Sequence, residues 1–215
     1  MSEAALHHLS RSDKIMARLI ARVGPCAWKP RRRRSPFEAL VQSVAYQQLN
    51  GTAAATIFGR VKALYPGKPF PTPADLIATP DELLRGAGLS RSKLAAIKDI
   101  AAHTLSGVVP TSRAIIRLSD DEILARLTTI RGVGPWTVHM LLMFKLGRPD
   151  ILPVSDYGVR KGFAVTYGLK DLPTHDELLA HGERWRPYRS FAAWYLWRAL
   201  ELPVNGKSRP ATPTP

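Results

Sequence analysis

The stretch Ile130–Thr137, IRGVGPWT, decides how this chain is expected to fold. It places Gly132 and Gly134 two residues apart, follows them with a proline, and lies between two apolar stretches with helical spacing. Glycine adopts the positive φ angles of tight turns without steric cost, and proline suits the first turn of a helix. The stretch therefore predicts a tight corner between two neighbouring helices, about residues 119–129 and 135–146.

The same corner has a chemical interpretation. Backbone N–H groups at the start of a helix point outward and bind phosphate. The chain has 31 Lys and Arg against 17 Asp and Glu, a formal charge of +14, so a nucleic-acid backbone is the first candidate partner. A plain joint, in which the glycines serve only the geometry, explains the spacing equally well, and the spacing alone leaves both interpretations open.

The rest of the chain is also predicted to be helical. Apolar residues recur at helical spacing, proline and glycine separate segments of helical length, and alternating strand patterns are absent. Residues 205–215 are expected to be a disordered tail, and His7-His8 a loose terminus. Expected helix caps are Ser35, Thr72, Thr79, Ser90 and Ser119. We predict an all-α protein with about ten helices, among them 11–23, 37–49, 52–65, 91–107, 119–129, 135–146, 157–168, 174–185 and 189–201.

Composition excludes several classes of protein. The single cysteine, Cys26, allows neither an internal disulfide nor a four-cysteine iron–sulfur cluster. The N-terminus lacks the apolar core of a secretory signal, and no apolar run reaches the ~18 residues that span a bilayer. A strongly amphipathic basic helix for membrane binding is missing as well. We expect an intracellular protein of the cytoplasm (nucleoid) or nucleus that does not bind membranes.

Four segments, which follow one another along the chain in the same order as in the family, resemble the base-excision DNA glycosylases. IRGVGPWT resembles their helix–hairpin–helix motif, and RPDILPVSDYGVRKGF resembles their glycine/proline-rich loop with its catalytic aspartate, here Asp156. ERWRPYRSFAAWYLWR, residues 183–198, resembles the C-terminal helix pair of the DNA-3-methyladenine glycosylase II family. SPFEALVQSVAYQQLNGTAA, residues 35–54, resembles that family's first core helix and following loop. The resemblance covers about residues 35–200, in the short form that lacks the N-terminal β domain.

The resemblance implies two helical lobes of the helix–hairpin–helix glycosylase type, with the active-site cleft between them. Residues 36–147 would form the lobe that contains the corner, and residues 1–35 and 148–204 the second lobe. It also implies that Asp156 stabilises the positive charge that develops on the sugar and orients or activates water. Asp beside a helix start is more usually a cap, and the residue pattern alone favours that structural role.

The resemblance further assigns a base pocket to Trp197, Trp136, Met140 and Tyr46. Aromatic faces attract a cationic alkylated purine through cation–π interactions. Trp136 stands where members that also cleave the backbone have lysine, so the resemblance implies a monofunctional enzyme. Met140 stands where the family has an aromatic residue. Large apolar residues on helices are usually plain core, and that interpretation stays open for these positions.

The remaining assignments concern DNA. The side chain that fills the gap left by a flipped base matches Gln48, between Gln47 and Leu49, and exposed amides at a helix end are the alternative. Phosphate-binding N–H groups match Gly132, Gly134 and Thr137. The family often holds an alkali ion on backbone carbonyls, which match Thr128, Ile130 and Val133; no other cofactor is implied, and the histidines show no metal-ligand spacing.

Together these features predict a monomeric, monofunctional DNA glycosylase. Its partner would be double-stranded DNA that contains alkylated purines of the 3-methyladenine or 7-methylguanine type, and it would act in base excision repair. Two alternatives remain. One is a non-catalytic helix–hairpin–helix DNA-binding protein, and the other is a related glycosylase for deaminated or oxidised bases.

Overall fold

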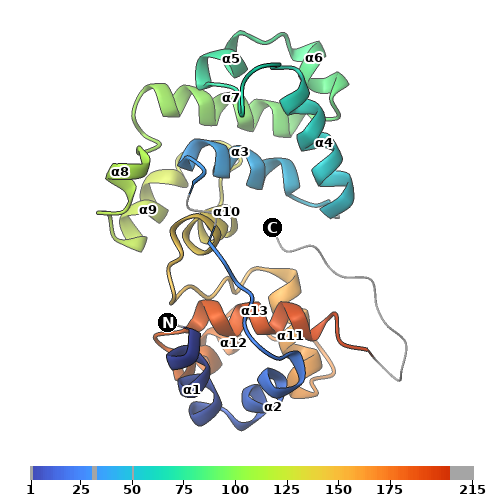
Figure 1. Cartoon of the computed structure of the whole chain (residues 1–215), viewed down its shortest axis with the longest axis vertical. Helices are drawn as coiled ribbons and strands as arrows, with labels where there is room; N and C mark the ends of the chain where they lie inside the picture. Colours follow the sequence, from blue (N-terminus) through green and yellow to red (C-terminus); the bar gives the residue numbers. More distant parts are fainter. Residues whose placement is uncertain (1, 31–32, 50, 204–215) are drawn as a thin grey trace. The chain divides into compact units, whose positions relative to one another are not determined.

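The computed structural model describes residues 2–30, 33–49 and 51–203, and in these residues every regular element is a helix (Figure 1). The predicted all-α fold is confirmed. The helices are α1 (Ser2–Ser12), α2 (Lys14–Val23), α3 (Pro36–Tyr46), α4 (Gly51–Ala63), α5 (Pro73–Ala78), α6 (Asp81–Gly86), α7 (Arg91–Leu105), α8 (Ser112–Ile115), α9 (Asp120–Leu127), α10 (Pro135–Met140), the π-helix η1 (Leu141–Leu146), α11 (Tyr157–Tyr167), α12 (His175–Gly182), the 3-10 helix η2 (Glu183–Trp185) and α13 (Arg189–Ala199). Among the described helices, none is long and apolar enough to cross a membrane.

The chain divides into two compact units. Unit 1 combines residues 1–30 with the chain from residue 147 onward and contains α1, α2, α11, α12, η2 and α13. Unit 2 spans residues 31–146 and contains α3 to α10 and η1. The expected tail at 205–215 lies outside the described residues.

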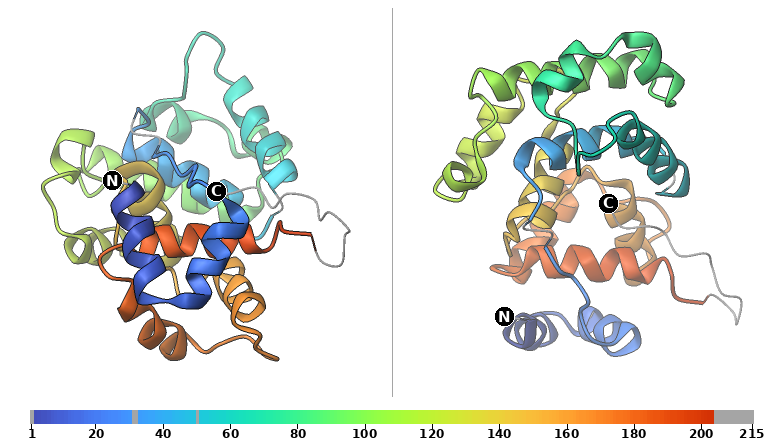
Figure 2. Two further views of the ribbon diagram at one scale, coloured as in Figure 1. Left: turned by 60° about the horizontal axis from the view of Figure 1, so that its bottom comes forward. Right: turned by 45° about the horizontal axis from the view of Figure 1, so that its top comes forward.

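Helix α13 runs through the core of unit 1. All of its residues except Arg198 are buried, because aromatic and small side chains cover its whole circumference. It packs against α1, α2 and α11 (Figure 2). The contact with α11 is very close: a Cβ on Gly162 would lie 2.0 Å from the Leu196 carbonyl oxygen, so only glycine fits there.

The N-terminal residues of unit 1 are ordered by a buried carboxylate. Asp13 caps α2 by accepting the N–H groups of Ile15 and Met16, which separates α1 from α2. Its other oxygen, Oδ2, accepts hydrogen bonds from Tyr167, His181 and Trp185, which come from the far end of the chain. These contacts bind the first two helices to the C-terminal ones.

Two predictions about this region were therefore wrong. The helix predicted at 11–23 is two helices, since residue 13 is a cap and not a helical residue. His7 and His8 lie within α1, and not in a loose terminus, because Ala5 and Leu9 on the same helix are completely buried.

In unit 2, α3 and α7 pack together and carry much of the apolar core. Ser35, Thr72, Ser90 and Ser119 cap helices as predicted. Thr79 does not, because its hydroxyl donates to the Asp75 carbonyl at the end of α5, and α6 begins without a side-chain cap. The long helix predicted at 135–146 changes at Leu141 from α-helical to π-helical hydrogen bonding.

Candidate active site and nucleic-acid interface

Asp156 lies at the N-cap of α11, in unit 1. Its Oδ1 accepts the Val159 N–H at 2.8 Å and the indole N–H of Trp197 at 2.8 Å. The side chain is largely buried, and 9% of the residue remains exposed. Asp156 therefore caps α11, as the residue pattern alone predicts. The oxygen that makes this cap, Oδ1, also accepts the hydrogen bond from Trp197 of α13.

Gly158 makes the contact between the carboxylate and the indole possible. A Cβ at this position would lie 2.8 Å from Cδ1 and 2.9 Å from Nε1 of Trp197, and 3.1 Å from Asp156 Oδ1. Contacts below 3.0 Å force one of the groups to move. The sequence analysis missed this residue, although its place directly after Asp156-Tyr157 at a helix start is a usable signal.

Trp197 was predicted to stack on the base. In the structure it is 5% exposed, and its indole N–H points at Asp156. Neighbouring Trp194 is buried too, and Arg198 lies over its ring at 5.5 Å from the centroid. Trp197 therefore belongs to the surroundings of the carboxylate, where low polarity strengthens a hydrogen bond to a charge.

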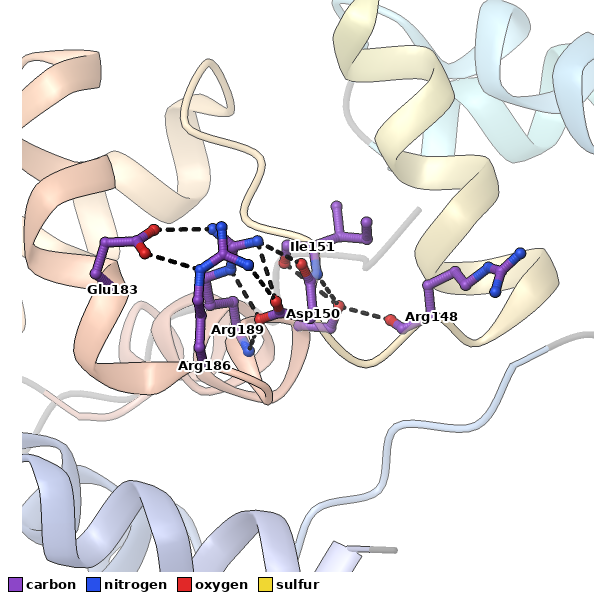
Figure 3. A network of polar contacts seen from close by, with 7 residues as sticks. Arg148, Asp150, Ile151, Glu183, Arg186 and Arg189 are labelled. Atoms are coloured by element: carbon purple, nitrogen blue, oxygen red, sulfur yellow. Dashed lines mark hydrogen bonds and ion pairs between the residues drawn. The ribbon is translucent and has the colours of Figure 1, made fainter. Parts of the chain in front are cut away.

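The loop before Asp156 is held by residues that the sequence analysis did not single out. Arg189, at the start of α13, binds the side chain and the carbonyl of Asp150 (Figure 3). Ser190, the next residue, binds the Arg148 carbonyl. The tripeptide Tyr-Arg-Ser directly before an apolar helix is the sequence signal for this arrangement, since polar groups at a buried helix start need partners.

The predicted corner joins α9 to α10 in unit 2. Gly132 has φ +75°, and a Cβ there would lie 2.6 Å from the Ala96 Cβ, so glycine is required twice over. Gly134 has φ −96° and is the N-cap of α10. The expectation of positive φ was correct for Gly132 and wrong for Gly134, whose added Cβ would meet nothing within 4 Å.

The corner is fixed by hydrogen bonds on both sides. The Val133 N–H donates to the Ile130 carbonyl at 3.1 Å, and the Arg131 N–H donates to Asp99 Oδ2 at 2.8 Å. Within the described part of the chain, the N–H groups of Gly132 and Gly134 donate no comparable backbone bond. These groups remain available for an anion.

Gln47 connects the corner to the turn after α3. Its Nε2 donates to the Gly132 carbonyl and to Thr137 Oγ1, each at 3.0 Å. Gln48 has φ +56°, and no other non-glycine residue of the described ranges has a positive φ. Gln48 and Leu49 are exposed. Since a left-handed conformation costs a non-glycine residue roughly 1–2 kcal/mol, the turn holds the Gln48 side chain outward at an energetic cost.

Tyr46 and Met140 line the same hollow on unit 2. Its empty volume is about 430 Å³, part of it open to solvent, and Gln42, Ser43 and Phe144 also line it. Met140 is buried, and Trp136 is half-buried on α10 outside this lining. The structure thus brings together two of the four predicted pocket residues, both within unit 2.

The predicted alkali ion would bind backbone carbonyls and not side chains. Groups of three or more His, Cys, Asp or Glu side chains that could hold a metal are absent from the described residues. Thr128 ends α9, and the Ile130 carbonyl, which has two lone pairs, accepts one N–H. Carbonyl oxygens are ligands that hard cations such as alkali ions take, and the alkali ion at this turn stays a prediction.

Comparison with known proteins identifies the family. Residues 41–187 match the model of the HhH-GPD superfamily base excision DNA repair proteins. DNA-3-methyladenine glycosylase 1 of Schizosaccharomyces pombe is 40% identical over 198 residues, 91% of this chain and 86% of that protein.

Solved structures agree with this result. The structure of the Schizosaccharomyces pombe 3-methyladenine DNA glycosylase in complex with abasic DNA matches with a TM-score of 0.87 at 40% identity, over 93% of this chain and 97% of that one. DNA-3-methyladenine glycosidase of Bacillus halodurans matches with a TM-score of 0.77 at 33% identity, over 91% and 88% of the two chains. The chain that carries the corner, the N-cap Asp156 and the buried α13 therefore belongs to the HhH-GPD superfamily of base excision DNA repair proteins.

Proposed function

We propose that the chain is a monofunctional DNA glycosylase that removes alkylated purines of the 3-methyladenine and 7-methylguanine type. The observation that carries this proposal is the fixed carboxylate of Asp156, which two donors hold through one oxygen. The names of the relatives support the same substrate class.

The chemistry follows from the charge of the substrate. An N3- or N7-alkylated purine is already cationic, so it leaves as a neutral base with little need for a general acid. As the N-glycosidic bond breaks, positive charge develops on the sugar, and the Asp156 carboxylate stabilises it electrostatically. The same carboxylate orients or activates the water that attacks the anomeric carbon.

Base recognition is assigned to Trp136, Met140, Tyr46 and Trp197. Tryptophan and tyrosine faces favour a cationic base over a neutral one by about 0.5–2 kcal/mol each. With Trp136 in place of a lysine, position 136 offers no amine for Schiff-base formation with the sugar, so we propose that the abasic site is left uncut.

DNA binding is assigned to the corner and the turn. The N–H groups of Gly132, Gly134 and Thr137 would bind backbone phosphate, and the carbonyls of Thr128, Ile130 and Val133 would hold an alkali ion beside it. Gln48 would enter the stack in place of the flipped base, with Leu49 alongside, while Gln47 supports the turn through the corner. We propose that the protein binds duplex DNA as a monomer.

The decisive experiment uses Asp156→Asn, because asparagine caps a helix about as well as aspartate. Purified wild type and variant are incubated with methylated duplex DNA, and the released bases are identified by chromatography. Wild type should release methylated purines and leave the strand intact, while the variant should lose release and keep its melting temperature and DNA affinity.

Other results would favour the alternatives. DNA binding by wild type without release of any base would favour a non-catalytic helix–hairpin–helix protein. Release from duplexes with deaminated or oxidised bases, but not with alkylated ones, would favour a glycosylase of different specificity. Full activity of Asp156→Asn would refute the assignment of that residue.

A further inference from the structure

The segment that ends at Asp156 is bound at both of its ends by one helix, α13. At the far end, Trp197 donates its indole N–H to Asp156 Oδ1. At the near end, Arg189 and Ser190 bind residues 148–151. Ser190 and Trp197 are seven positions apart, which is about 10 Å along a helix. Two positions on one rigid, buried helix therefore fix the segment.

Arg189 is the main side-chain contact at the near end. Its Nε and Nη2 donate to Asp150 Oδ1 and Oδ2 at 2.8 and 3.2 Å, and Nη2 also donates to the Asp150 carbonyl at 2.9 Å. The Arg189 side chain is only 11% exposed. A guanidinium that binds a carboxylate with two nitrogens and a carbonyl with one of them fixes orientation as well as distance.

Ser190 binds the backbone on both sides of Asp150. Its hydroxyl donates to the Arg148 carbonyl at 2.7 Å and accepts the Ile151 N–H at 2.9 Å, while its own N–H donates to the Pro149 carbonyl at 2.9 Å. Ser190 is completely buried. Loss of its hydroxyl would leave the buried Ile151 N–H and the half-buried Arg148 carbonyl without this partner, and an unsatisfied buried group is costly.

The charges of this cluster are matched. Glu183 and Asp150 each pair with both Arg186 and Arg189, so that the four ion pairs form a closed ring (Figure 3). Arg186 is on the outer side of the ring, with a side chain that is 49% exposed and no bond to the loop backbone among the contacts of the described chain. It has the same charge and the same carboxylate partners as Arg189, and it serves as the matched control.

We propose that Arg189 and Ser190 are positioning residues for Asp156, which act by fixing the segment 148–156 against α13. This inference rests on the proposed function of Asp156. The chain between the two anchors is short and buried at Ile151, Leu152 and Pro153, so a shift at the near end is transmitted to the carboxylate. A misplacement of about 1 Å at a reacting group lowers a rate by up to roughly a hundredfold.

The test measures three variants, Arg189→Lys, Ser190→Ala and the control Arg186→Lys, against wild type. The readouts are the single-turnover rate constant of base release at saturating enzyme, the fraction of enzyme that binds DNA, the affinity for abasic duplex DNA, and the melting temperature. Arg189→Lys and Ser190→Ala should lower the rate roughly ten- to a hundredfold with nearly unchanged DNA affinity, whereas Arg186→Lys should stay within about twofold.

The comparison of rate with DNA affinity separates positioning from stability. A displaced carboxylate lowers the single-turnover rate constant at saturating enzyme, while the affinity for abasic duplex DNA stays near that of wild type. A mere loss of folded protein lowers the fraction of enzyme that binds DNA and leaves the rate constant of the folded fraction unchanged.

Either of two results would overturn the proposal: rate constants within twofold of wild type in both variants, or a loss of activity that is explained entirely by a smaller fraction of DNA-binding enzyme. Asp150→Asn is the reserve variant should Arg189→Lys fail to fold, because the amide keeps an acceptor for Arg189 Nε; the same loss of rate with retained DNA affinity is expected. If wild type releases no base, or Asp156→Asn stays active, the proposed function itself fails, and that outcome is visible before any of these variants is compared.

Discussion

Gly158→Ala isolates the contact between Asp156 and Trp197 from the stability of the fold. The added methyl would stand 2.8 and 2.9 Å from two atoms of the Trp197 ring, where contacts below 3.0 Å are not tolerated and ordinary contacts begin at 3.4 Å, so the ring or the helix must shift. The methyl also approaches Asp156 Oδ1 at 3.1 Å, and the two groups are thus driven apart.

The size of the effect follows from the bond that is lost. The Trp197 N–H bond to Asp156 spans 2.8 Å, and a hydrogen bond to a charged group contributes about 1.5–3 kcal/mol. If that energy is lost in the transition state, base release slows roughly ten- to a hundredfold. Folding should suffer much less, because alanine is favoured over glycine in a helix by about 1 kcal/mol, which offsets part of the strain.

The assay compares Gly158→Ala with Gly59→Ala, a glycine-to-alanine change within α4 whose new methyl meets nothing within 4 Å. Single-turnover base release from methylated duplex DNA and thermal melting are measured for both variants and for wild type. Gly59→Ala should keep the wild-type rate. A wild-type rate in Gly158→Ala would show that the indole–carboxylate contact does not contribute to the reaction.

Two further predictions concern parts of the molecule away from that contact. Burial by itself would raise the pKa of Asp13, but hydrogen bonds from His181 and Tyr167, then from the Met16 N–H and Trp185, lower it well below its usual range. A lowered folded-state pKa means that the stabilisation is complete above the unfolded pKa of about 4 and is lost as the pH falls below it. The free energy of unfolding of Asp13→Asn should therefore be roughly 3 kcal/mol below that of wild type at pH 7. In urea titrations at pH 3 the difference between the two free energies should be smaller. A difference that is the same at both pH values would contradict this prediction. In the corner, Gln47→Ala and Thr137→Val should each weaken binding to abasic duplex DNA, and the double variant should be little worse than either single one, because both changes break the same hydrogen bond. Thr137→Ser, which keeps the hydroxyl, is the control, and strictly additive losses of affinity would mean that the two side chains act separately.

The sequence was informative wherever a local signal determined the structure. Helices follow from apolar spacing and from side-chain caps such as Ser119, and the turn at Gly132 follows from the need for positive φ. The residue pattern predicts Asp156 as a helix cap, which the structure confirms, whereas its catalytic role was inferred from the resemblance to the glycosylase family and stays a prediction. What could not be predicted depends on residues far apart in sequence: the donation from Trp197 to Asp156, or from Ser190 to the Arg148 carbonyl, spans about forty positions.

Two errors in the prediction have different origins. Gly134 shares the spacing of Gly132 but serves as an extended N-cap. The break at Asp13 was missed because its partners Tyr167, His181 and Trp185 lie more than 150 positions away. The tertiary hydrogen bonds to the Asp13 carboxylate hold α1 and α2 in place against the C-terminal helices.

Unit 1 is built from the two ends of the chain, which has a consequence for biosynthesis. Its polar ties, such as the bond from Tyr195 to the Gly24 carbonyl, join residues up to 172 positions apart. Unit 2 is continuous and leaves the ribosome before the second half of unit 1 has been translated, so it is free to fold early through short-range contacts. Helices α1 and α2 cannot pack into unit 1 until α13 has been translated. A nascent chain that stalls before residue 189 would carry a folded corner but would lack α13, the helix that orients Asp156.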